Sequence, residues 1–340
     1  MENARLRKNT QPQCVSCLYN IIFNFSYTFM RFEVVNEIYK AALRDKRVYF
    51  LTGDLGHTKT EEFRKNLRGR YYNTGMAEQN MATMAAGLAL SGKKVFIYSI
   101  SPFVTLRCFE QIKVDICLHE ADVTIVGVGS GLAYGAAGAT HYSLEEVAAL
   151  RALPHMKIVC PATPYEACAL TKEIIRIGGP AYLRIGRGKE PNLPNEYPLV
   201  VGKAVVVRPG KEVTLIASGT ILLEALRAAE LCAKQEVDIE VAHMHTVKPL
   251  DQAFILERAA NRKALYTLEE HMENGGLGGA VAEVVAGMYG ARAPLHRFAV
   301  PDRWPRKVGS QEYLRHSFGL SAEKVAETII AFTRSHYGHN

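Results

Sequence analysis

The sequence predicts an α/β fold of two domains, each a mostly parallel sheet flanked by helices. Three observations predict it. From residue 30 onward, segments with helical periodicity alternate with short runs rich in Val and Ile, the pattern of a parallel sheet covered on both faces. A proline-containing stretch near residues 190–202 interrupts this alternation. The length of 340 residues suits two domains better than one.

The first domain is expected over residues 30–195. Apolar residues recur at helical spacing in segments 32–45, 78–92, 104–119, 143–153 and 165–178. Short apolar runs rich in β-branched residues predict strands at 47–56, 93–100, 122–131, 156–162 and 180–188. Helices and strands therefore alternate through this domain, as they do in a parallel sheet with crossover helices.

The second domain is expected over residues 200–340 and repeats the pattern in a shorter form. Strands are predicted at 212–219, 238–250 and 263–271. Helices are predicted at 221–232, 277–290 and 321–338. No internal repeat stands out.

The charge is moderately positive. Lys and Arg number 41 against 34 Asp and Glu, a formal net charge of +7. These residues are spread along the chain without a basic block, so no nucleic-acid partner is expected. A mild positive field fits anionic small molecules, such as a phosphorylated sugar or a diphosphate cofactor, as well as it fits an ordinary solvated surface.

Seven cysteines, an odd number scattered through apolar segments, indicate reduced thiols and a cytoplasmic protein. Cys14 and Cys17 form a CxxC pair, but no second pair stands nearby to complete a zinc site. Residues 1–29 hold a basic and an apolar stretch, yet asparagines interrupt it and no small-residue cleavage site follows. The stretch is too short and too polar to span a membrane. Residues 1–29 are therefore treated as an extension of unknown role, and no membrane association is expected.

Residues 74–81 read TGMAEQNM and place Glu78 at the start of an otherwise apolar helix. One explanation is a surface glutamate, because negative charge is favourable at a helix N-terminus. The other is a carboxylate shielded from water. Burial favours the protonated form of a carboxylate, so such a group suits acid–base chemistry near neutral pH.

Longer motifs follow in a fixed order along the chain. They are YYNTGMAEQNMATMAAGLALSGKKVFIYSISPF, GATHYSLEEVAALRALPHMKIVCPATPYEA, AYLRIGRG, VKPLD, TLEEHMENGGLGGAVAE and GSQEYLRHSFGLSAEKV. From about residue 33 to the end, the chain resembles the pyrimidine-binding and C-terminal domains of the transketolase family of thiamine-diphosphate enzymes. The resemblance implies those two domain folds and thiamine diphosphate as the cofactor.

The resemblance also implies cofactor contacts. Glu78 matches the glutamate that hydrogen-bonds N1′ of the aminopyrimidine ring, which helps the ring take the proton from thiazolium C2. Tyr98 matches an aromatic that packs against the pyrimidine. Phe103 is a candidate second wall, although its spacing differs from the family's usual aromatic pair. Both aromatics could instead be core residues, and Asp54 is a candidate to line the cofactor cleft.

His141, Arg187 and Arg107 are the implied substrate contacts. His141 matches a histidine that donates to substrate oxygens, and its alternative role is to cap the helix predicted at 143–153. Arg187 matches an arginine that grips the phosphate of sugar-phosphate substrates, for which a bidentate fork is suited. Arg107 is a further candidate, whereas Arg184 is either structural or a competitor of Arg187.

Two family residues that read substrate hydroxyls are missing. Ala137 stands where an aspartate is usual, and Gly129 lies near the position of an upstream histidine. Losing both polar contacts should weaken discrimination for an ordinary ketose. The donor is therefore not expected to be a standard pentose or hexose phosphate.

The motif GDG…N, which holds the diphosphate and its divalent metal in the family, is imitated by GDLG at 53–56 with Asn80 downstream. Leu55 replaces the third residue of the motif, and the stretch lies inside the pyrimidine-domain match, so no metal is expected there. The resemblance then implies a separate N-terminal subunit that carries this motif and holds Mg²⁺ or Ca²⁺. GGLGG at 275–279 lacks the spacing of a dinucleotide loop.

These inferences together predict the C-terminal subunit of a split transketolase-like enzyme, active with its partner in an α2β2 assembly. It would transfer a ketol or acyl unit from a 2-keto donor, a sugar or sugar phosphate, to an aldehyde acceptor. One alternative is the β subunit of a 2-oxoacid dehydrogenase. Another is a non-catalytic assembly or regulatory protein with the same fold. A nucleotide-dependent oxidoreductase is a third, resting on the α/β pattern and the glycines at 275–279.

Overall fold

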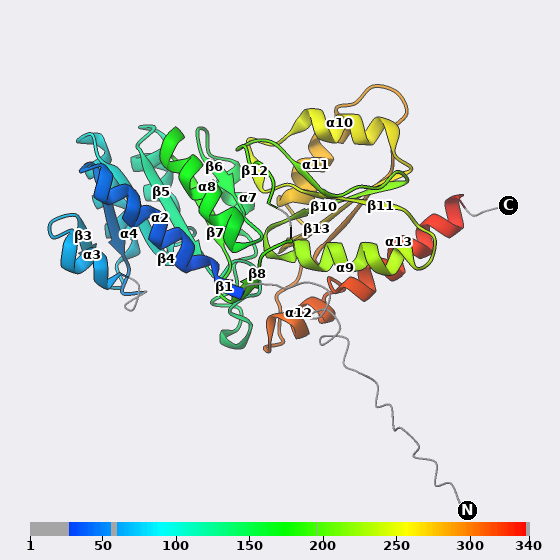
Figure 1. Ribbon diagram of the computed structural model, residues 1–340, viewed down its shortest axis with the longest axis horizontal. Coiled ribbons are helices and arrows are strands. Elements are labelled where there is room, and N and C mark those ends of the chain that lie inside the picture. Colours follow the sequence, from blue (N-terminus) through cyan, green and yellow to red (C-terminus); the bar gives the residue numbers. More distant parts are fainter. Residues whose placement is uncertain (1–26, 56–59, 195, 338–340) are drawn as a thin grey trace, which may run out of the picture.

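The computed structural model describes residues 27–55, 60–194 and 196–337. Two sheet-based domains lie side by side, the first blue to green and the second yellow-green to red in Figure 1. Residues 1–26 of the predicted extension, with Cys14 and Cys17, lie outside the described residues. Residues 27–29 form strand β1, which pairs antiparallel with β8 in a small two-stranded sheet. These two strands are β1 (Tyr27–Phe29) and β8 (Lys189–Pro191).

A seven-stranded sheet forms the centre of the first domain, in the order β12-β6-β7-β5-β4-β2-β3. Every neighbouring pair is parallel except β12 with β6. The strands are β2 (Val48–Thr52), β3 (Tyr71–Asn73), β4 (Lys94–Ile100), β5 (Val123–Val128), β6 (Lys157–Val159), β7 (Ala181–Ile185) and β12 (Thr246–Lys248). All residues of the central strand β5 are buried, as expected for a strand covered on both faces.

Helices cover both faces of this sheet. α2 and α8 pack on one face, and α4, the π-helical segment η1 and α7 pack on the other. They are α2 (Met30–Arg44), α4 (Glu78–Leu90), η1 (Ile112–Cys117), α7 (Glu146–Arg151) and α8 (Pro164–Ile177). Shorter segments are α3 (Glu61–Asn66), α5 (Ser101–Val104), α6 (Phe109–Gln111) and the 3₁₀ turn η2 (Gly135–Ala137).

The second domain is built on a five-stranded sheet in the order β14-β13-β10-β11-β9, where only β9 runs antiparallel to its neighbour. Its strands are β9 (Val205–Arg208), β10 (Val213–Ser218), β11 (Ile239–His243), β13 (Ala264–Met272) and β14 (Leu295–Val300). α9 and α13 pack on one face, and α10 and α11 on the other. The helical elements are η3 (Gly219–Ile221), α9 (Leu222–Ala233), α10 (Gln252–Asn261), α11 (Leu277–Ala286), α12 (Gln311–Ser317) and α13 (Ala322–Tyr337).

The predicted fold class is confirmed, but two predicted elements are wrong as single units. The helix predicted over 104–119 forms α5, α6 and η1 in succession. Thr105 follows α5, and both its hydroxyl, at 2.5 Å, and its N–H, at 3.1 Å, donate to the Ser101 carbonyl, an arrangement that bends helices. The strand predicted over 238–250 splits into β11 and β12. The sequence patterns also do not predict β1, β3, β8, β9, β14, α3, α10 and α12.

Strand β12 joins the two halves of the molecule. It follows β11 of the second sheet along the chain, yet it pairs with β6 of the first sheet. At the crossing point, the backbone N–H of Met244 donates to Ala217 at 2.8 Å, and that of Cys160 donates to His245 at 2.7 Å. Because the chain breaks between β11 and β12, one segment can form backbone hydrogen bonds with strands of both sheets.

Five cysteines of the described residues are free: Cys108, Cys117, Cys160, Cys168 and Cys232. Burial raises the pKa of each of these thiols, to about 12 for Cys108 and Cys232. Such thiols stay protonated and unreactive near neutral pH. Among the described helices, none combines the length and apolar character needed to cross a membrane.

Candidate active site

The carboxylate of Glu78 is buried at the first residue of α4, with 2% of the residue exposed. Ser99 Oγ, on the neighbouring strand β4, donates to Glu78 Oε1 at 3.1 Å. Arg107 Nη1 donates to Oε2 at 2.6 Å. Gly53, at the end of β2, lies close enough that a Cβ there would come within 3.4 Å of Glu78 Cγ. Of the two explanations that the sequence allows for Glu78, the structure therefore supports the shielded carboxylate and not the surface glutamate.

Two favourable effects stabilise this buried charge. The helix N-terminus carries a partial positive charge, and the carboxylate sits there. The Arg107 guanidinium supplies a full positive charge and one of the two side-chain hydrogen bonds. A carboxylate held in this way can accept a hydrogen bond from another N–H donor in place of the guanidinium.

Phe103 and His141 continue from this ion pair. The Arg107 guanidinium carbon lies 4.1 Å from the centre of the Phe103 ring, a cation–π arrangement. The Phe103 and His141 rings meet edge-on with centroids 5.1 Å apart. His141 Nδ1 lies 2.9 Å from Thr140 Oγ1, and α7 begins only at Glu146. His141 therefore does not cap that helix.

Tyr134 and Arg187 complete the group. The Tyr134 ring lies 5.9 Å from that of His141, and the Arg187 guanidinium carbon lies 4.4 Å from the Tyr134 ring centre. Arg187 is exposed just after β7, so its donors can reach a ligand. The structure thus connects five of the predicted site residues, and Tyr134, which is not predicted from the sequence, lies between two of them. We call the set the contact chain: Glu78, Arg107, Phe103, His141, Tyr134 and Arg187.

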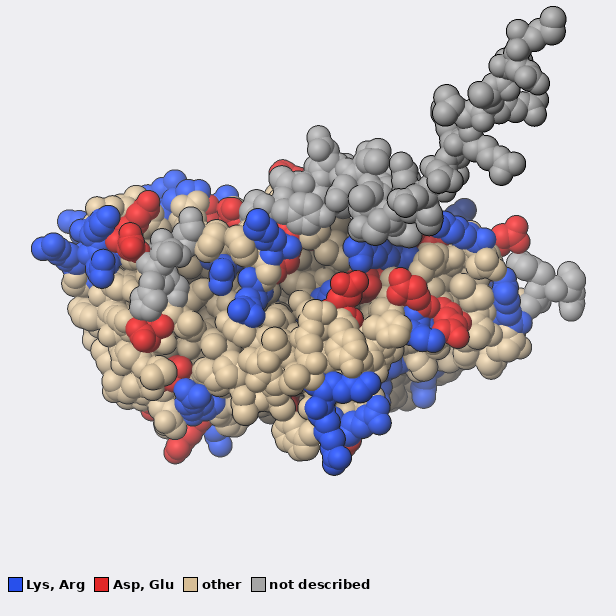
Figure 2. All heavy atoms as spheres, turned by 90° about the horizontal axis from the view of Figure 1, so that it is seen from below, with Lys and Arg blue, Asp and Glu red and all other residues tan. Residues whose placement is uncertain are grey.

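The contact chain lies at the carboxyl ends of the parallel strands, where ligands bind in open α/β sheets. Glu78, Arg107 and Phe103 lie around the end of β4. His141 and Tyr134 come from the segment after β5, and Arg187 follows β7. Figure 2 views the molecule from below, and uncharged residues cover much of the middle of that face, with basic and acidic groups interspersed around them.

Tyr98 lies on the opposite face of β4 from the Glu78 carboxylate. Its neighbour Ser99 faces Glu78, and successive strand residues face opposite sides of a sheet. Tyr98 packs in the core beneath α2, with its ring 5.8 Å from that of Phe50, and burial raises the pKa of its hydroxyl. Its predicted contact with the cofactor stays a prediction.

Asp54 lies next to Gly53 but points to the surface. Its left-handed backbone, with φ of 59°, is held by Asn73, which accepts from the Asp54 N–H at 3.1 Å. The Asn73 amide also donates to the Asp54 carboxylate at 2.9 Å. Its predicted place along the cofactor cleft stays a prediction.

Arg184 is structural. It is buried in β7, where Nε donates to Glu146 at 2.6 Å. Its Nη2 donates at 2.9 Å to the carbonyls of both Ser143 and Glu270. Burial opposes the charge of Arg184, but the facing Glu146 carboxylate raises its pKa, so the guanidinium stays charged. These bonds leave Arg187 as the exposed arginine of this segment.

Ser99 and Tyr134 were missed at the sequence level. A serine inside an otherwise apolar strand was the available signal for Ser99. For Tyr134 the signal was a large aromatic between glycines, in GLAYG. The structure also explains Gly129: its φ is +81°, and a Cβ there would meet the Tyr134 ring at 2.0 Å. Tyr134 thus lies against the position near which the family carries a histidine.

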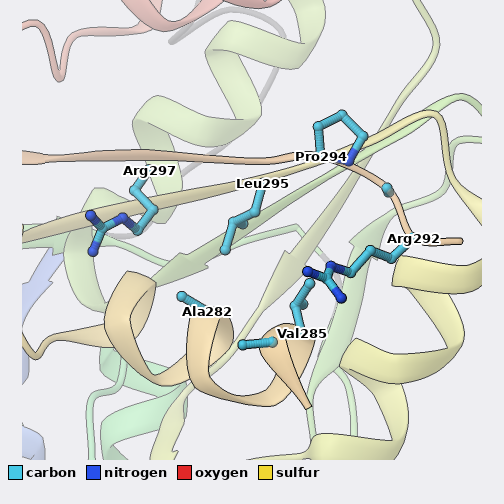
Figure 3. Close-up of a pocket in the computed structure, with 8 residues that line it drawn as sticks. Ala282, Val285, Arg292, Pro294, Leu295 and Arg297 are labelled. Atoms are coloured by element: carbon cyan, nitrogen blue, oxygen red, sulfur yellow. The ribbon is translucent and has the colours of Figure 1, made fainter. Parts of the chain in front are cut away.

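A separate pocket of about 530 Å³ lies in the second domain between α11 and β14. Figure 3 shows Ala282, Val285 and Leu295 along it, with Arg292 and Arg297 at either side. Arg297 Nη1 already donates to the Glu273 carbonyl at 2.8 Å. None of the contact-chain residues lines this pocket.

Comparison with known proteins connects both domains to one family. Residues 30–191 match the family model of the transketolase pyrimidine-binding domain, and residues 202–325 match that of the transketolase C-terminal domain. The chain is 33% identical over 307 residues to one of the subunits of the apulose-4-phosphate transketolase of Phocaeicola vulgatus, covering 89% of this chain and 97% of that one. It is also 33% identical over 299 residues to a 6-deoxy-6-sulfo-D-fructose transketolase subunit of a Clostridium species, covering 87% and 92%.

The fold comparison agrees. A solved structure described as a split-gene transketolase in an inactive β4 tetramer superposes with a TM-score of 0.79 and 31% identity. The match covers 89% of this chain and 97% of that one. Both domains match in the same order and over nearly the full length of these relatives. The chain therefore belongs to the transketolase family and is similar to subunits of its split members.

Proposed function

We propose that this chain is the C-terminal subunit of a split, thiamine-diphosphate-dependent transketolase-like transferase. It would transfer a ketol or acyl unit from a 2-keto donor to an aldehyde acceptor. The observation that carries the proposal is the burial of Glu78 at the head of the contact chain. Along the carboxyl ends of the strands, the buried Glu78 carboxylate is followed by His141 and then by the exposed Arg187.

The residues around Glu78 fit an aminopyrimidine ring. Gly53 has no Cβ to crowd Glu78, since one would lie 3.4 Å from its Cγ, and Ser99 fixes one of the carboxylate oxygens. The second oxygen accepts from Arg107, whose side chain is 42% exposed and can be displaced. When bound, thiamine diphosphate supplies the nucleophilic carbon for cleavage next to the donor carbonyl. Glu78 would hold a proton at the ring nitrogen, and Phe103 would offer an aromatic wall.

His141 and Arg187 would act on the substrate. His141 is partly exposed and can donate a proton to, or accept one from, a substrate oxygen. Arg187 is exposed and stacked on Tyr134, which orients its planar fork for a phosphate or a similar anion. Tyr134 contacts both residues. Arg187 would therefore bind the anionic end of a substrate while His141 contacts its reacting end.

The donor would be an unusual sugar or sugar phosphate. Ala137 is exposed in η2 where the family's aspartate would read a hydroxyl, and Tyr134 lies against Gly129. The two similar subunits belong to transketolases of apulose-4-phosphate and of a 6-deoxy-6-sulfo sugar, so substrates differ among relatives of this chain. Both of those sugars carry an acidic group, a phosphate in one and a sulfo group in the other, which Arg187 would suit.

A separate N-terminal subunit would carry the diphosphate and its Mg²⁺ or Ca²⁺, and the assembly would be α2β2. Apolar side chains beside Glu78 support a covering partner. Met76 is 84% exposed just before α4, and Met84, on α4, and Leu106 are also exposed. We propose domain limits of 30–195 and 200–340, with β12 as a strand exchanged between them.

Reconstitution tests this function. The chain would be purified together with a candidate N-terminal partner that carries GDG…N, supplied with thiamine diphosphate and Mg²⁺, and screened with 2-keto donors and aldehydes by product mass. We expect transfer only when both proteins are present. Acyl transfer to a lipoyl domain would favour the 2-oxoacid dehydrogenase alternative. Saturable, metal-dependent binding of the cofactor to this chain alone would contradict the split arrangement.

A further inference from the structure

His141 and Tyr134 lie on one closed loop. A pair of backbone hydrogen bonds joins its ends: Gly131 N–H donates to Ser143 at 3.1 Å, and Ser143 N–H donates to Gly131 at 3.0 Å. We call residues 131–143 the His141 loop. Because its ends are tied, the position of His141 depends on what holds the loop at its base and at its tip.

At the base, the loop meets Glu270 of β13 in the second domain. Glu270 is 2% exposed, and its Oε2 accepts from the Leu132 N–H at 3.3 Å. Gly131 passes so close that a Cβ there would lie 2.3 Å from the same oxygen. With φ of +61° as well, Gly131 must be glycine for the carboxylate to reach the loop.

Helix α12 fixes the carboxylate of Glu270. Gln311 Nε2 donates to both carboxylate oxygens, at 3.0 and 2.8 Å, and Arg315 Nε donates to Oε1. Arg315 Nη2 also donates to Thr220 Oγ1 at 3.2 Å. Each oxygen of Glu270 therefore accepts only N–H donors, and the side chain is held in one orientation.

The loop is held a second time near its tip by the segment that leads into α12. The Tyr142 hydroxyl lies 2.9 Å from the carbonyl oxygens of both Gly135 and Lys307. The Gly309 N–H donates to Gly135 at 3.2 Å. In Figure 1, α12 lies beside the loop between β5 and α7 at the lower edge of the molecule. Residues 307–315 of the second domain thus bind the loop directly near its tip and hold its base indirectly, through Glu270.

We propose that Glu270 is a positioning residue for His141, and that the second domain contributes to the reaction through Glu270 and α12. This inference rests on the proposed function of His141. Its physical basis is that a catalytic group must be held within a fraction of an ångström, and rigid neighbours supply that restraint. Within the described part of the first domain, the hydrogen bonds at the ends of the loop include its own closing pair, the one from Arg184 to Ser143 and the one from the Ala133 N–H to Ser130.

Glu270→Gln tests the proposal. A glutamine amide would place an NH₂ group against an existing N–H donor in either orientation, so the contact to the loop should weaken. Glu240→Gln is the matched control. Glu240 is also a buried strand carboxylate of the same sheet, but its partners Arg258 and Thr214 lie far along the chain from the His141 loop.

The first measurement is amide hydrogen exchange in the purified chain. We expect Glu270→Gln to speed exchange in residues 132–142 by about tenfold relative to Glu240→Gln, because the loop opens locally. Gln311→Ala removes one donor and leaves Arg315 in place, so it should give a smaller change in the same direction. Unchanged exchange in folded Glu270→Gln would overturn the claim that Glu270 holds the loop.

The second measurement is the kinetics of the reconstituted enzyme. We expect Glu270→Gln to lower kcat by about tenfold, with KM for the donor changed much less, while Glu240→Gln leaves kcat near wild type. A faster-exchanging loop with an unchanged kcat would overturn the positioning role. If the wild-type pair transfers nothing, the proposed function fails instead, and the exchange data still decide whether Glu270 holds the loop.

Discussion

Glu78 and Arg107 form a 2.6 Å ion pair in which the carboxylate is buried and the guanidinium is partly open to solvent. The two partners therefore differ in what they would lose on separation. Arg107 can turn towards water, whereas Glu78 would be left with the single hydrogen bond from Ser99. In the proposed enzyme, the ring nitrogen of the cofactor would replace Arg107 as the partner of Glu78.

We predict that Glu78→Gln abolishes most activity of the reconstituted enzyme while leaving the fold intact. Loss of a proton-transferring carboxylate should lower kcat by about 10²–10⁴-fold. The control is Glu37→Gln, which changes another buried carboxylate of the first domain, paired with Lys40. Steady-state kinetics of both variants, with circular dichroism to confirm folding, make the comparison. Full activity of Glu78→Gln would revive the non-catalytic alternative.

Arg107→Met should destabilise the isolated chain, because it leaves the buried Glu78 carboxylate without its charged partner. We expect a loss of about 1–2 kcal/mol in the free energy of unfolding, less than for a fully buried pair because Arg107 is partly exposed. Denaturant titration measures it. In a Glu78→Gln background the same substitution should cost much less. An equal loss in both backgrounds would show that Arg107 acts through packing on Phe103.

Arg187→Ala should raise KM for an anionic donor by about 10–100-fold, because the exposed fork above Tyr134 would no longer bind the anion. KM for an uncharged donor of the same length should change little. Arg176→Ala is the control, since Arg176 is an exposed arginine of α8 paired with Glu173. Equal effects on charged and uncharged donors would argue against anion binding by Arg187.

Glu190 should make stability depend on pH. Burial raises the pKa of Glu190 to about 7. The hydrogen bond that its carboxylate accepts from the Met30 N–H lowers the pKa and offsets this rise only in part. Between about pH 4.5 and 7, the unfolded chain releases this proton while the folded chain keeps it. Stability should therefore fall as pH rises through this window, by about 3 kcal/mol in the simplest case, and level off above it.

Glu190→Gln isolates that contribution, because its amide oxygen can still accept from Met30 without titrating. Unfolding free energies measured at pH 5 and pH 8 should differ less for the variant than for the wild type. Identical pH dependence in the two proteins would mean that Glu190 ionises normally in the folded chain.

The sequence was sufficient for features that depend on local pattern. Alternating periodicities predicted both sheets, and a carboxylate before the run that holds Met81 and Ala85 marked the one buried acid of α4. The contact of His141 with Phe103 could not be predicted in this way. It joins residues 38 positions apart whose distance is set by the sheet rather than by local spacing (141 − 103 = 38).

Tertiary packing decided the rest. The resemblance implies a cofactor contact for Tyr98, which stays a prediction. Side chains alternate across β4, and the Tyr98 ring packs in the core beneath α2. The role of Glu270 could not be predicted from the sequence. Its hydrogen-bond partners lie far from it along the chain, on α12 and in the His141 loop. Buried polar groups must find partners, but their identity depends on the whole fold.

Strand β12 sets a limit on how the protein can be divided. A fragment ending near residue 200 would strip β6 of its antiparallel neighbour and expose that border of the seven-stranded sheet. Unpaired backbone groups on an exposed edge strand can hydrogen-bond to other chains, so the truncated fragment should aggregate and be poorly soluble. Extending the fragment past residue 248 would restore the missing pairing and include β10, but it would leave β10 without its parallel neighbour β13. Strand β12 thus links the two domains, and separating them would require a different cover for the edge of β6.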